Sequence, residues 1–298
     1  MEWRFWRRRD PTSRIGASVE AKPPSAISAR PLFVLGVPRS GTTLVAKVLN
    51  AHPNVLITNE TRPLTFFKHA LDVIPTGDKG GLHCAREHGA EFAAALKASG
   101  KDTIERAYAA IADVQGKREL CYWGDKNPHA SDSLELLEGW FPDAKLVVVR
   151  RDLRDTVCSI LELWCRMGIV SVSDSDDPGC WSVTDEKLQT CCNSVRSAVR
   201  AEEAYVARKP KSASFRLEYE RLLEDPEGVL GRLCVEFLGL ADPTPMIQHI
   251  AKNKATDVHG FLQGKVDFAD RSVGRWRRDL SPDQRELVTS AFREDGMV

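Results

Sequence analysis

Residues 36–43 read GVPRSGTT and follow the apolar run LFVL at 32–35. A short apolar run that ends in glycine is typical of a buried parallel strand. From Thr42 to Asn50 apolar residues recur at helical spacing, and a His-Pro pair ends the pattern. We therefore predict a strand, a glycine loop and a helix, whose backbone N–H groups and positive helix end favour a phosphate-like anion. The alternative is a tight turn that needs its glycines only for their backbone angles.

The loop departs at one position from the common phosphate-binding pattern, G-x-x-x-x-G-K-[ST]. Gly36 and Gly41 have the spacing of that pattern, and Thr43 fills its last position. Thr42 stands where the pattern has the lysine that reaches the outer phosphates. The loop is therefore expected to hold an anion that has no distant phosphate to reach.

A second apolar run, KLVVV at 145–149, predicts another buried strand and ends in Arg150-Arg151. P-loop enzymes carry a carboxylate at the end of such a strand, where it helps to hold magnesium. Guanidinium groups instead bind anions directly, through paired hydrogen bonds. The pattern indicates a nucleotide that lacks a triphosphate tail and is held without a divalent ion.

The rest of the chain alternates between predicted strands and helices, which favours an α/β fold with a parallel sheet covered on both faces. Residues 31–298 are expected to form a single domain, and residues 1–30 a basic, flexible tail whose contact with an anionic membrane surface is the less favoured alternative. Further strands are expected at 55–57 and 214–217. Helices are expected at 84–99, 102–115, 131–140, 155–167, 185–208, 226–238 and after Ser281-Pro282, with a polar loop at 169–183 and an irregular stretch at 260–275.

Composition excludes several classes of function. The 298 residues carry no net charge, so no overall field selects nucleic acid. No apolar run approaches the length of a membrane span, and the start lacks the apolar core of a signal peptide, so we expect a cytoplasmic protein. The eight cysteines include no C-x-x-C pair, so we expect no metal site and mostly buried thiols.

Two segments together resemble the signatures of sulfotransferases that use PAPS, 3′-phosphoadenosine 5′-phosphosulfate. GVPRSGTTLVAKVLNAHPN at 36–54 resembles the loop that holds the 5′-phosphosulfate. VVVRRDLRDTVCSI at 147–160 resembles the R-D-x-R-x-x-x-x-S segment that holds the 3′-phosphate. The motifs are most similar to those of tyrosylprotein sulfotransferases and their bacterial relatives, in which an E-T-R segment like Glu60-Thr61-Arg62 follows. The resemblance implies a P-loop-type parallel sheet flanked by helices, the sulfotransferase fold.

The resemblance also implies which residues hold the nucleotide. The 5′ side falls to the loop, Arg39, Ser40, Gly41, Thr42 and Thr43, and the 3′-phosphate to Arg151 and Ser159. A tyrosine that touches the nucleotide corresponds to Tyr219, and a late loop that folds over it corresponds to Ser272, Arg275 and Trp276.

Three residues are expected to carry the chemistry. Glu60 follows the predicted strand 55–57, at the end of a parallel sheet where active residues gather, and matches the family's catalytic base. Lys126 matches a lysine that contacts the leaving oxygen, and Arg39 is expected to add charge at the sulfonate. A surface Glu60 paired with Arg62 and a solvated Lys126 are the corresponding structural alternatives.

One departure weakens a tyrosine-sulfating assignment. Gly274 stands where tyrosylprotein sulfotransferases have a catalytic serine, and Ser272 lies two residues earlier. We therefore expect sulfuryl transfer from PAPS to a hydroxyl of a small molecule, sugar, lipid or phenol, without metal. The alternatives are a P-loop small-molecule kinase and a non-catalytic protein that binds PAP, the 3′,5′-bisphosphate product.

Overall fold

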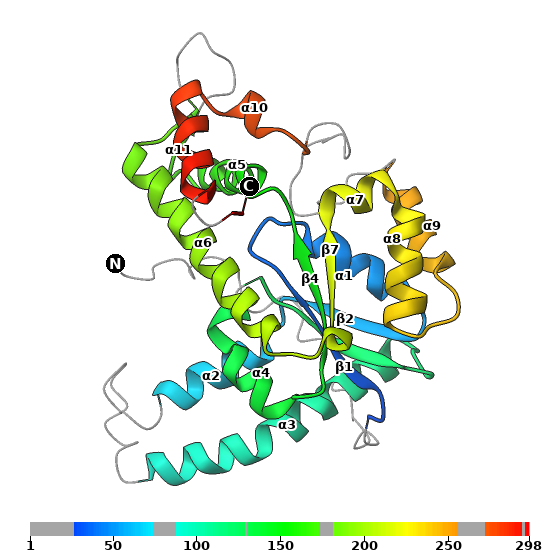
Figure 1. Ribbon diagram of the computed structural model, residues 1–298. Coiled ribbons are helices and arrows are strands. Elements are labelled where there is room, and N and C mark those ends of the chain that lie inside the picture. The colour runs from blue at the N-terminus through cyan, green and yellow to red at the C-terminus, as the bar shows by residue number, and fades with distance from the viewer. Residues whose placement is uncertain are drawn as a thin grey trace, which may run out of the picture.

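A five-stranded, wholly parallel sheet forms the centre of the molecule, in the order β2-β3-β1-β4-β7 (Figure 1). The computed structural model describes residues 27–73, 88–128, 130–172, 181–254, 272–293 and 296–297. The strands are β1 Arg30–Leu35, β2 Val55–Asn59, β3 Tyr122–Lys126, β4 Lys145–Arg150 and β7 Ser214–Glu218, with a short antiparallel pair, β5 Ser171–Val172 and β6 Trp181–Ser182. This confirms the predicted α/β fold in a single domain.

Helices cover both faces of the sheet because its strands are apolar on both sides. In β1, Leu32 and Val34 belong to one buried cluster, whereas Phe33 and Leu35 belong to the other. The first face is covered by α1 Thr42–Asn50, α7 Tyr219–Glu224, α8 Pro226–Gly231, the π-helical turns Arg232–Phe237 and α9 Thr244–Lys254. The second is covered by α2 Pro63–Val73, α3 Gly89–Val114, the 3-10 turn Ala130–Ser133 and α4 Leu134–Trp140.

A third buried cluster forms where α5, Leu153–Arg166, leaves the end of β4 (upper left in Figure 1). Helices α6 Asp185–Ala207, α10 Trp276–Asp279 and α11 Pro282–Arg293 pack around it. Cys158, Cys191 and Cys192 are buried in this cluster, as expected for thiols that act as small apolar side chains. Within the described residues no helix is long and apolar enough to cross a membrane.

Most predicted elements are present, but three expectations need correction. The two helices predicted at 84–99 and 102–115 are one helix from Gly89, with residues 84–87 outside the described part. Gly100 lies inside this helix, where a β-carbon added to it would lie 2.2 Å from the ring of Trp140. Residues 122–126 form an unpredicted strand, and the helix predicted at 226–238 divides into α8 and π-helical turns.

Several expectations fall outside the described residues. These are the tail up to residue 26, the centre of the polar loop at 173–180, and residues 260–271 of the irregular stretch predicted at 260–275. Residues 27–30 are described, and Ile27 and Ala29 pack against the cluster on the second face of the sheet.

We predict that Gly124→Ala destabilises the protein by about 3 kcal/mol, because overpacking the core forces its neighbours apart. A β-carbon at Gly124 would lie 1.9 Å from the carbonyl oxygen of Leu32, in the backbone of the adjacent strand. Urea unfolding followed by tryptophan fluorescence measures the change.

The matched control is Gly139→Ala, an exposed glycine of α4 whose added β-carbon would meet nothing within 4 Å. It should be neutral or stabilising by up to about 1 kcal/mol, since alanine favours helix. Equal stabilities of the two variants would contradict the tight contact of β3 with β1.

Candidate active site

A cavity of about 280 Å³ opens where the five parallel strands end. Each strand contributes lining residues from the segment that follows it or from its last position. They are Pro38, Arg39, Gly41, Thr42, Thr43 and Leu44 after β1, Glu60 and Arg62 after β2, Lys126 and Pro128 from β3, Arg151, Ser159 and Leu163 after β4, and Tyr219 after β7. The carboxyl ends of a parallel sheet are the usual place for a ligand.

The glycine loop forms a cradle at the start of α1. Gly41 immediately precedes the helix with φ at 96°, a left-handed backbone that favours glycine. A β-carbon there would lie 2.3 Å from the ring of Tyr219, so the space between loop and ring also excludes a side chain. Ser40 is buried, and its hydroxyl makes no hydrogen bond among the described residues.

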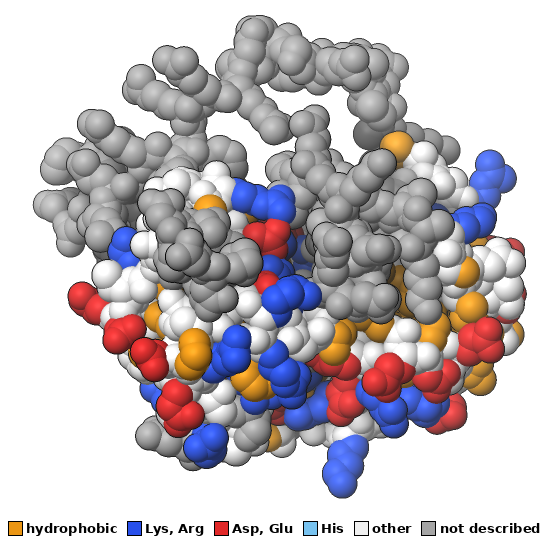
Figure 2. All heavy atoms as spheres, turned by 90° about the horizontal axis from the view of Figure 1, so that it is seen from above, with side chains coloured by type: hydrophobic (Ala, Val, Ile, Leu, Met, Phe, Trp, Pro, Cys, Tyr) orange, Lys and Arg blue, Asp and Glu red, His pale blue; other side chains and the backbone are white. Residues whose placement is uncertain are grey.

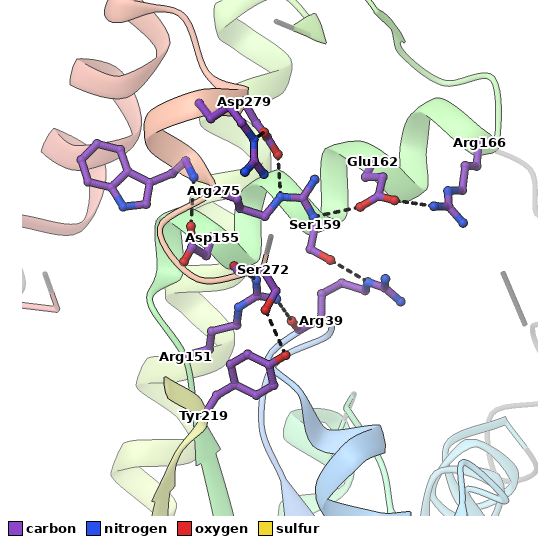
Figure 3. Close-up of polar contacts among 12 residues, drawn as sticks. Arg39, Arg151, Asp155, Ser159, Glu162, Arg166, Tyr219, Ser272, Arg275 and Asp279 are labelled. Atoms are coloured by element: carbon purple, nitrogen blue, oxygen red, sulfur yellow. Dashed lines mark hydrogen bonds and ion pairs between the residues drawn. The ribbon is translucent and has the colours of Figure 1, made fainter. Parts of the chain in front are cut away.

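The two segments that resembled sulfotransferase signatures touch each other (Figure 3). Arg151 donates from Nη1 to the carbonyl oxygen of Arg39 at 3.0 Å. Arg39 in turn donates from Nε to the hydroxyl of Ser159 at 3.1 Å. Residues 112 and 120 positions apart in the sequence are thereby brought to one wall of the cavity.

The lining carries a local excess of positive charge. Arg39, Arg62, Lys126 and Arg151 face the cavity with a single carboxylate, that of Glu60. Burial lowers the pKa of Arg39, and although Glu162 opposes this shift, the nearby guanidinium groups lower the pKa further. Over the described part of the face in Figure 2, by contrast, Lys and Arg side chains are interspersed with Asp and Glu. A small anion in the cavity is therefore favoured over a polyanion spread across the surface.

The carboxylate of Glu60 lies between two cations. Lys126 donates from Nζ to Oε1 at 2.6 Å, and Arg62 donates from Nη2 to Oε2 at 2.5 Å. Burial opposes the charged form of Glu60, but Lys126 and Arg62 outweigh it and lower its pKa. Lys126 is fully buried and also donates to the hydroxyl of Thr43 at 3.0 Å. Burial lowers the pKa of Lys126, against the opposing effect of Glu60.

Backbone strain is concentrated at this cavity. Within the described residues, the non-glycine residues with positive φ are Arg39 at 70°, Glu60 at 58° and Arg62 at 51°. All three line the cavity. A left-handed backbone costs a residue with a β-carbon roughly 1–2 kcal/mol, so neighbouring contacts must hold these positions.

Of the three residues predicted in the late loop (Ser272, Arg275 and Trp276), Ser272 contacts residues that line the cavity. The carbonyl oxygen of Ser272 accepts a hydrogen bond from Arg151 at 2.5 Å, and its hydroxyl lies 3.3 Å from that of Tyr219. Arg275 donates instead to Glu162 at 2.9 Å and to Asp279 at 2.6 Å (Figure 3). It does not line the cavity, and its role at the nucleotide stays a prediction.

Trp276 packs away from the cavity lining, between two guanidinium groups. The Cζ atoms of Arg154 and Arg277 lie 4.0 Å and 4.4 Å from its ring centroid. Its main-chain N–H and that of Gly274 donate to the buried carboxylate of Asp155, at 3.0 Å and 2.7 Å. Trp276 is therefore not a lining residue of the cavity, and its contact with a nucleotide stays a prediction.

The two arginines at the end of β4, Arg150 and Arg151, contact different parts of the protein. Arg150 binds Glu202 and Glu203 of α6, at 2.7 Å and 2.9 Å, and only Arg151 reaches the cavity. Asp152 caps α5 by accepting a hydrogen bond from the main-chain N–H of Arg154.

Sequence reasoning did not assign four residues that shape the site. Arg62 was part of a quoted motif, and Glu162 lies one turn after Ser159 on the same helix. Asp125 and Asp155 are buried carboxylates that accept hydrogen bonds from loop backbone. For Asp125, the sequence offered one signal, which was its position next to Lys126.

Residues 31–244 match the family model described as the sulfotransferase family. The chain belongs to the sulfotransferase family. Nodulation protein NoeE of Sinorhizobium fredii is 25% identical to it over 285 residues, which cover 91% of this chain and 66% of that protein. Protein-tyrosine sulfotransferase 1 of Danio rerio is 32% identical over 130 residues, or 44% of this chain and 35% of that protein.

The solved sulfotransferase domain of the olefin synthase of Synechococcus PCC 7002 has the same fold. It is 20% identical, aligns over 90% of this chain and 97% of that domain, and superposes with a TM-score of 0.53. The family is thus one of transferases that move sulfuryl groups. The chain matches about two thirds of the nodulation protein and about one third of the zebrafish protein, so their acceptors are not carried over.

We predict that Glu60→Gln lowers the free energy of unfolding near neutral pH by about 1–3 kcal/mol, since it leaves the buried ammonium of Lys126 without its anion. Losing this charge should lower the pKa of Lys126 further. The difference in unfolding free energy between wild type and variant is therefore fully present at pH values below the Lys126 pKa of the folded variant. It decreases as the pH rises from there to the higher Lys126 pKa of the folded wild type. It also shrinks in acid, where Glu60 of the wild type becomes protonated.

Urea unfolding at a series of pH values measures this difference. The control is Glu224→Gln, which removes an exposed ion pair with Arg221 and should change stability little at any pH. A stability difference for Glu60→Gln that does not vary with pH would contradict the coupling of Glu60 to Lys126.

Proposed function

We propose that the protein transfers a sulfuryl group from PAPS to the hydroxyl of an acceptor. The observation that carries the proposal is the cavity itself, where four cationic side chains and one carboxylate surround a glycine loop that lacks the P-loop lysine. A charge excess of this kind suits an anionic donor that brings no divalent ion.

The residues present fit such a donor. The buried hydroxyl of Ser40 and the buried Nε of Arg151 make no hydrogen bond among the described residues, and an anion's oxygens would satisfy both. The loop from Arg39 to Thr43 would hold the 5′ side, and Arg151, Ser159 and Tyr219 the 3′-phosphate side. PAPS would supply a sulfuryl group joined to a phosphate, which leaves when an acceptor oxygen attacks the sulfur.

Glu60 would take the proton of the acceptor hydroxyl. Its lowered pKa keeps the carboxylate ionised at neutral pH, and an anion beside Lys126 would compete with Glu60 for the ammonium. Weakening that ion pair raises the proton affinity of Glu60 and makes it a better base. The proton ends on the Glu60 carboxylate, while the new sulfate ester leaves with the acceptor.

Lys126 and Arg39 would stabilise charge that develops during transfer. Lys126 is a buried ammonium, so its interaction with a leaving phosphate oxygen is little screened by water. Arg39 lies in the glycine loop and would act on the sulfonate. Thr43 accepts a hydrogen bond from Lys126 and fixes the ammonium between loop and base.

We predict that the protein moves ³⁵S from labelled PAPS onto at least one hydroxyl compound in a panel of phenols, sugars and lipids. Glu60→Gln should lower kcat by about 10²–10⁴-fold, because the attacking hydroxyl loses its base. The Michaelis constant for PAPS should not rise, since Glu60 is not assigned to the donor and competes with it for Lys126. Chromatography of labelled products at a temperature where both proteins are folded measures the effect.

Glu224→Gln serves again as the control and should keep wild-type kcat, because its pair with Arg221 is exposed and lies outside the cavity. The same panel is run with γ-labelled ATP and magnesium. Label transfer from ATP but not from PAPS would replace the proposal with a small-molecule kinase. Binding of PAPS without transfer to acceptor or water would indicate a non-catalytic nucleotide-binding protein.

A further inference from the structure

Directly beneath the segment 60–62 lies Asp125, a buried carboxylate with 2% exposure on β3. Its Oδ1 accepts from the hydroxyl of Thr58 at 2.8 Å, and from the main-chain N–H and the hydroxyl of Thr61, both at 3.2 Å. Its Oδ2 accepts from the main-chain N–H of Arg62 at 3.0 Å. One carboxylate thus receives two main-chain and two hydroxyl hydrogen bonds.

The segment 60–62, which donates hydrogen bonds to Asp125, has an unfavourable backbone conformation. Glu60 and Arg62 both have positive φ, although each carries a β-carbon. The main-chain N–H of Glu60 donates to the carbonyl oxygen of Lys126 at 3.0 Å, so the segment is attached to β3 at three successive amides. Such a conformation persists only where its surroundings hold it, and Asp125 supplies the charged acceptor for two of the three amides.

A tyrosine from α3 closes the network on the side away from the cavity. The hydroxyl of Tyr108 lies 2.6 Å from that of Thr58, which also donates to Asp125. Burial raises the pKa of Tyr108 far above its usual range, so its hydroxyl is protonated and available as a donor. Asp125 is not itself a lining residue of the cavity, and it acts on the reaction only through its neighbours that are, Arg62 and Lys126.

We propose that Asp125 is a positioning residue for sulfuryl transfer: its carboxylate holds the segment 60–62 so that Glu60 faces Lys126 and the cavity, and its charge supports the ammonium of Lys126. This inference rests on the proposed function for the roles of Glu60 and Lys126. The placement of the segment by Asp125 does not depend on that function.

The charge effect has a definite sign. Burial lowers the pKa of Lys126, the charges of Glu60 and then Asp125 oppose this, and Arg62 adds to it. The other group in contact with the ammonium is the uncharged hydroxyl of Thr43 on α1. Removing the charge of Asp125 therefore lowers the pKa of Lys126, so that the ammonium loses its proton at a lower pH.

Asp125→Asn tests the proposal, because the amide keeps the shape but offers one acceptor oxygen and two N–H donors. Hydrogen exchange of the amides of Thr61 and Arg62 should become about tenfold faster or more. With PAPS and an active acceptor, kcat should fall by about 10²-fold through misplacement of Glu60. The Michaelis constant for PAPS should stay near wild type, and the alkaline limb of the kcat profile should move to lower pH.

Asp155→Asn is the matched control, since Asp155 is also a buried carboxylate that accepts two main-chain N–H groups. It should speed exchange at Gly274 and Trp276 and leave Thr61 and Arg62 unchanged. Thr61→Val removes one hydroxyl donor to Asp125 and should give an intermediate effect at the segment 60–62, which keeps the test decisive if Asp125→Asn does not fold.

Wild-type exchange at Thr61 and Arg62 in Asp125→Asn, or in Thr61→Val where the first variant does not fold, would overturn the placement. Faster exchange with an unmoved alkaline limb would overturn the charge effect. Should the wild-type protein transfer no sulfuryl group, the proposed function fails, while the exchange measurement still decides whether Asp125 holds the segment.

Discussion

The structure depends on how it accommodates several cations in one partly buried cavity. Arg39, Arg62, Lys126 and Arg151 line it with only Glu60 as a lining carboxylate. Like charges in a desolvated place repel each other, and burial alone already disfavours them. The lowered pKa values of Arg39 and Lys126 reflect this cost. An anionic ligand would relieve the repulsion, which is why we propose a phosphosulfate donor for this site.

Besides Glu60, which lines the cavity, the carboxylates near these cations lie outside its lining. Glu162 is one of them and binds Arg275 and Arg166 (Figure 3). Asp155 and Asp125 are buried carboxylates that accept main-chain N–H groups of two site loops. The lining of the cavity therefore stays positively charged, while the side chains that hold its loops from outside are carboxylates. Such an arrangement fixes the loops before any ligand binds, so little reorganisation is needed on binding.

The sequence predicted the parts whose signals are local. The strand, glycine loop and helix around Gly36 to Asn50 follow from an apolar run, turn residues and helical spacing, and the structure contains all three. Strand β3 escaped prediction because YWGDK carries a glycine that fits against Leu32, a loop-holding aspartate and a site lysine, none of which is typical of a buried strand. The glycine at position 100 inside α3 is explained by its contact with Trp140, 40 residues away, and only the folded chain shows that contact.

For the site, the sequence likewise predicted residues that belong to motifs but not the contacts that depend on the folded chain. Arg39 and Ser159 came from separate motifs, and the structure joins them by a hydrogen bond. The divergence of Arg150 and Arg151 follows from the alternation of side chains along a strand, and could have been foreseen. The turn of Arg275 toward Glu162 and Asp279 could not, because it depends on how α5 and α10 meet.

Calorimetric titration with PAP, in EDTA and then in excess magnesium, tests most directly whether the cavity binds its nucleotide through backbone and cationic side chains alone. The account predicts one site with the same affinity under both conditions, and an affinity that falls steeply with salt and in Arg151→Met. No binding at millimolar PAP, or binding that requires magnesium, would contradict it.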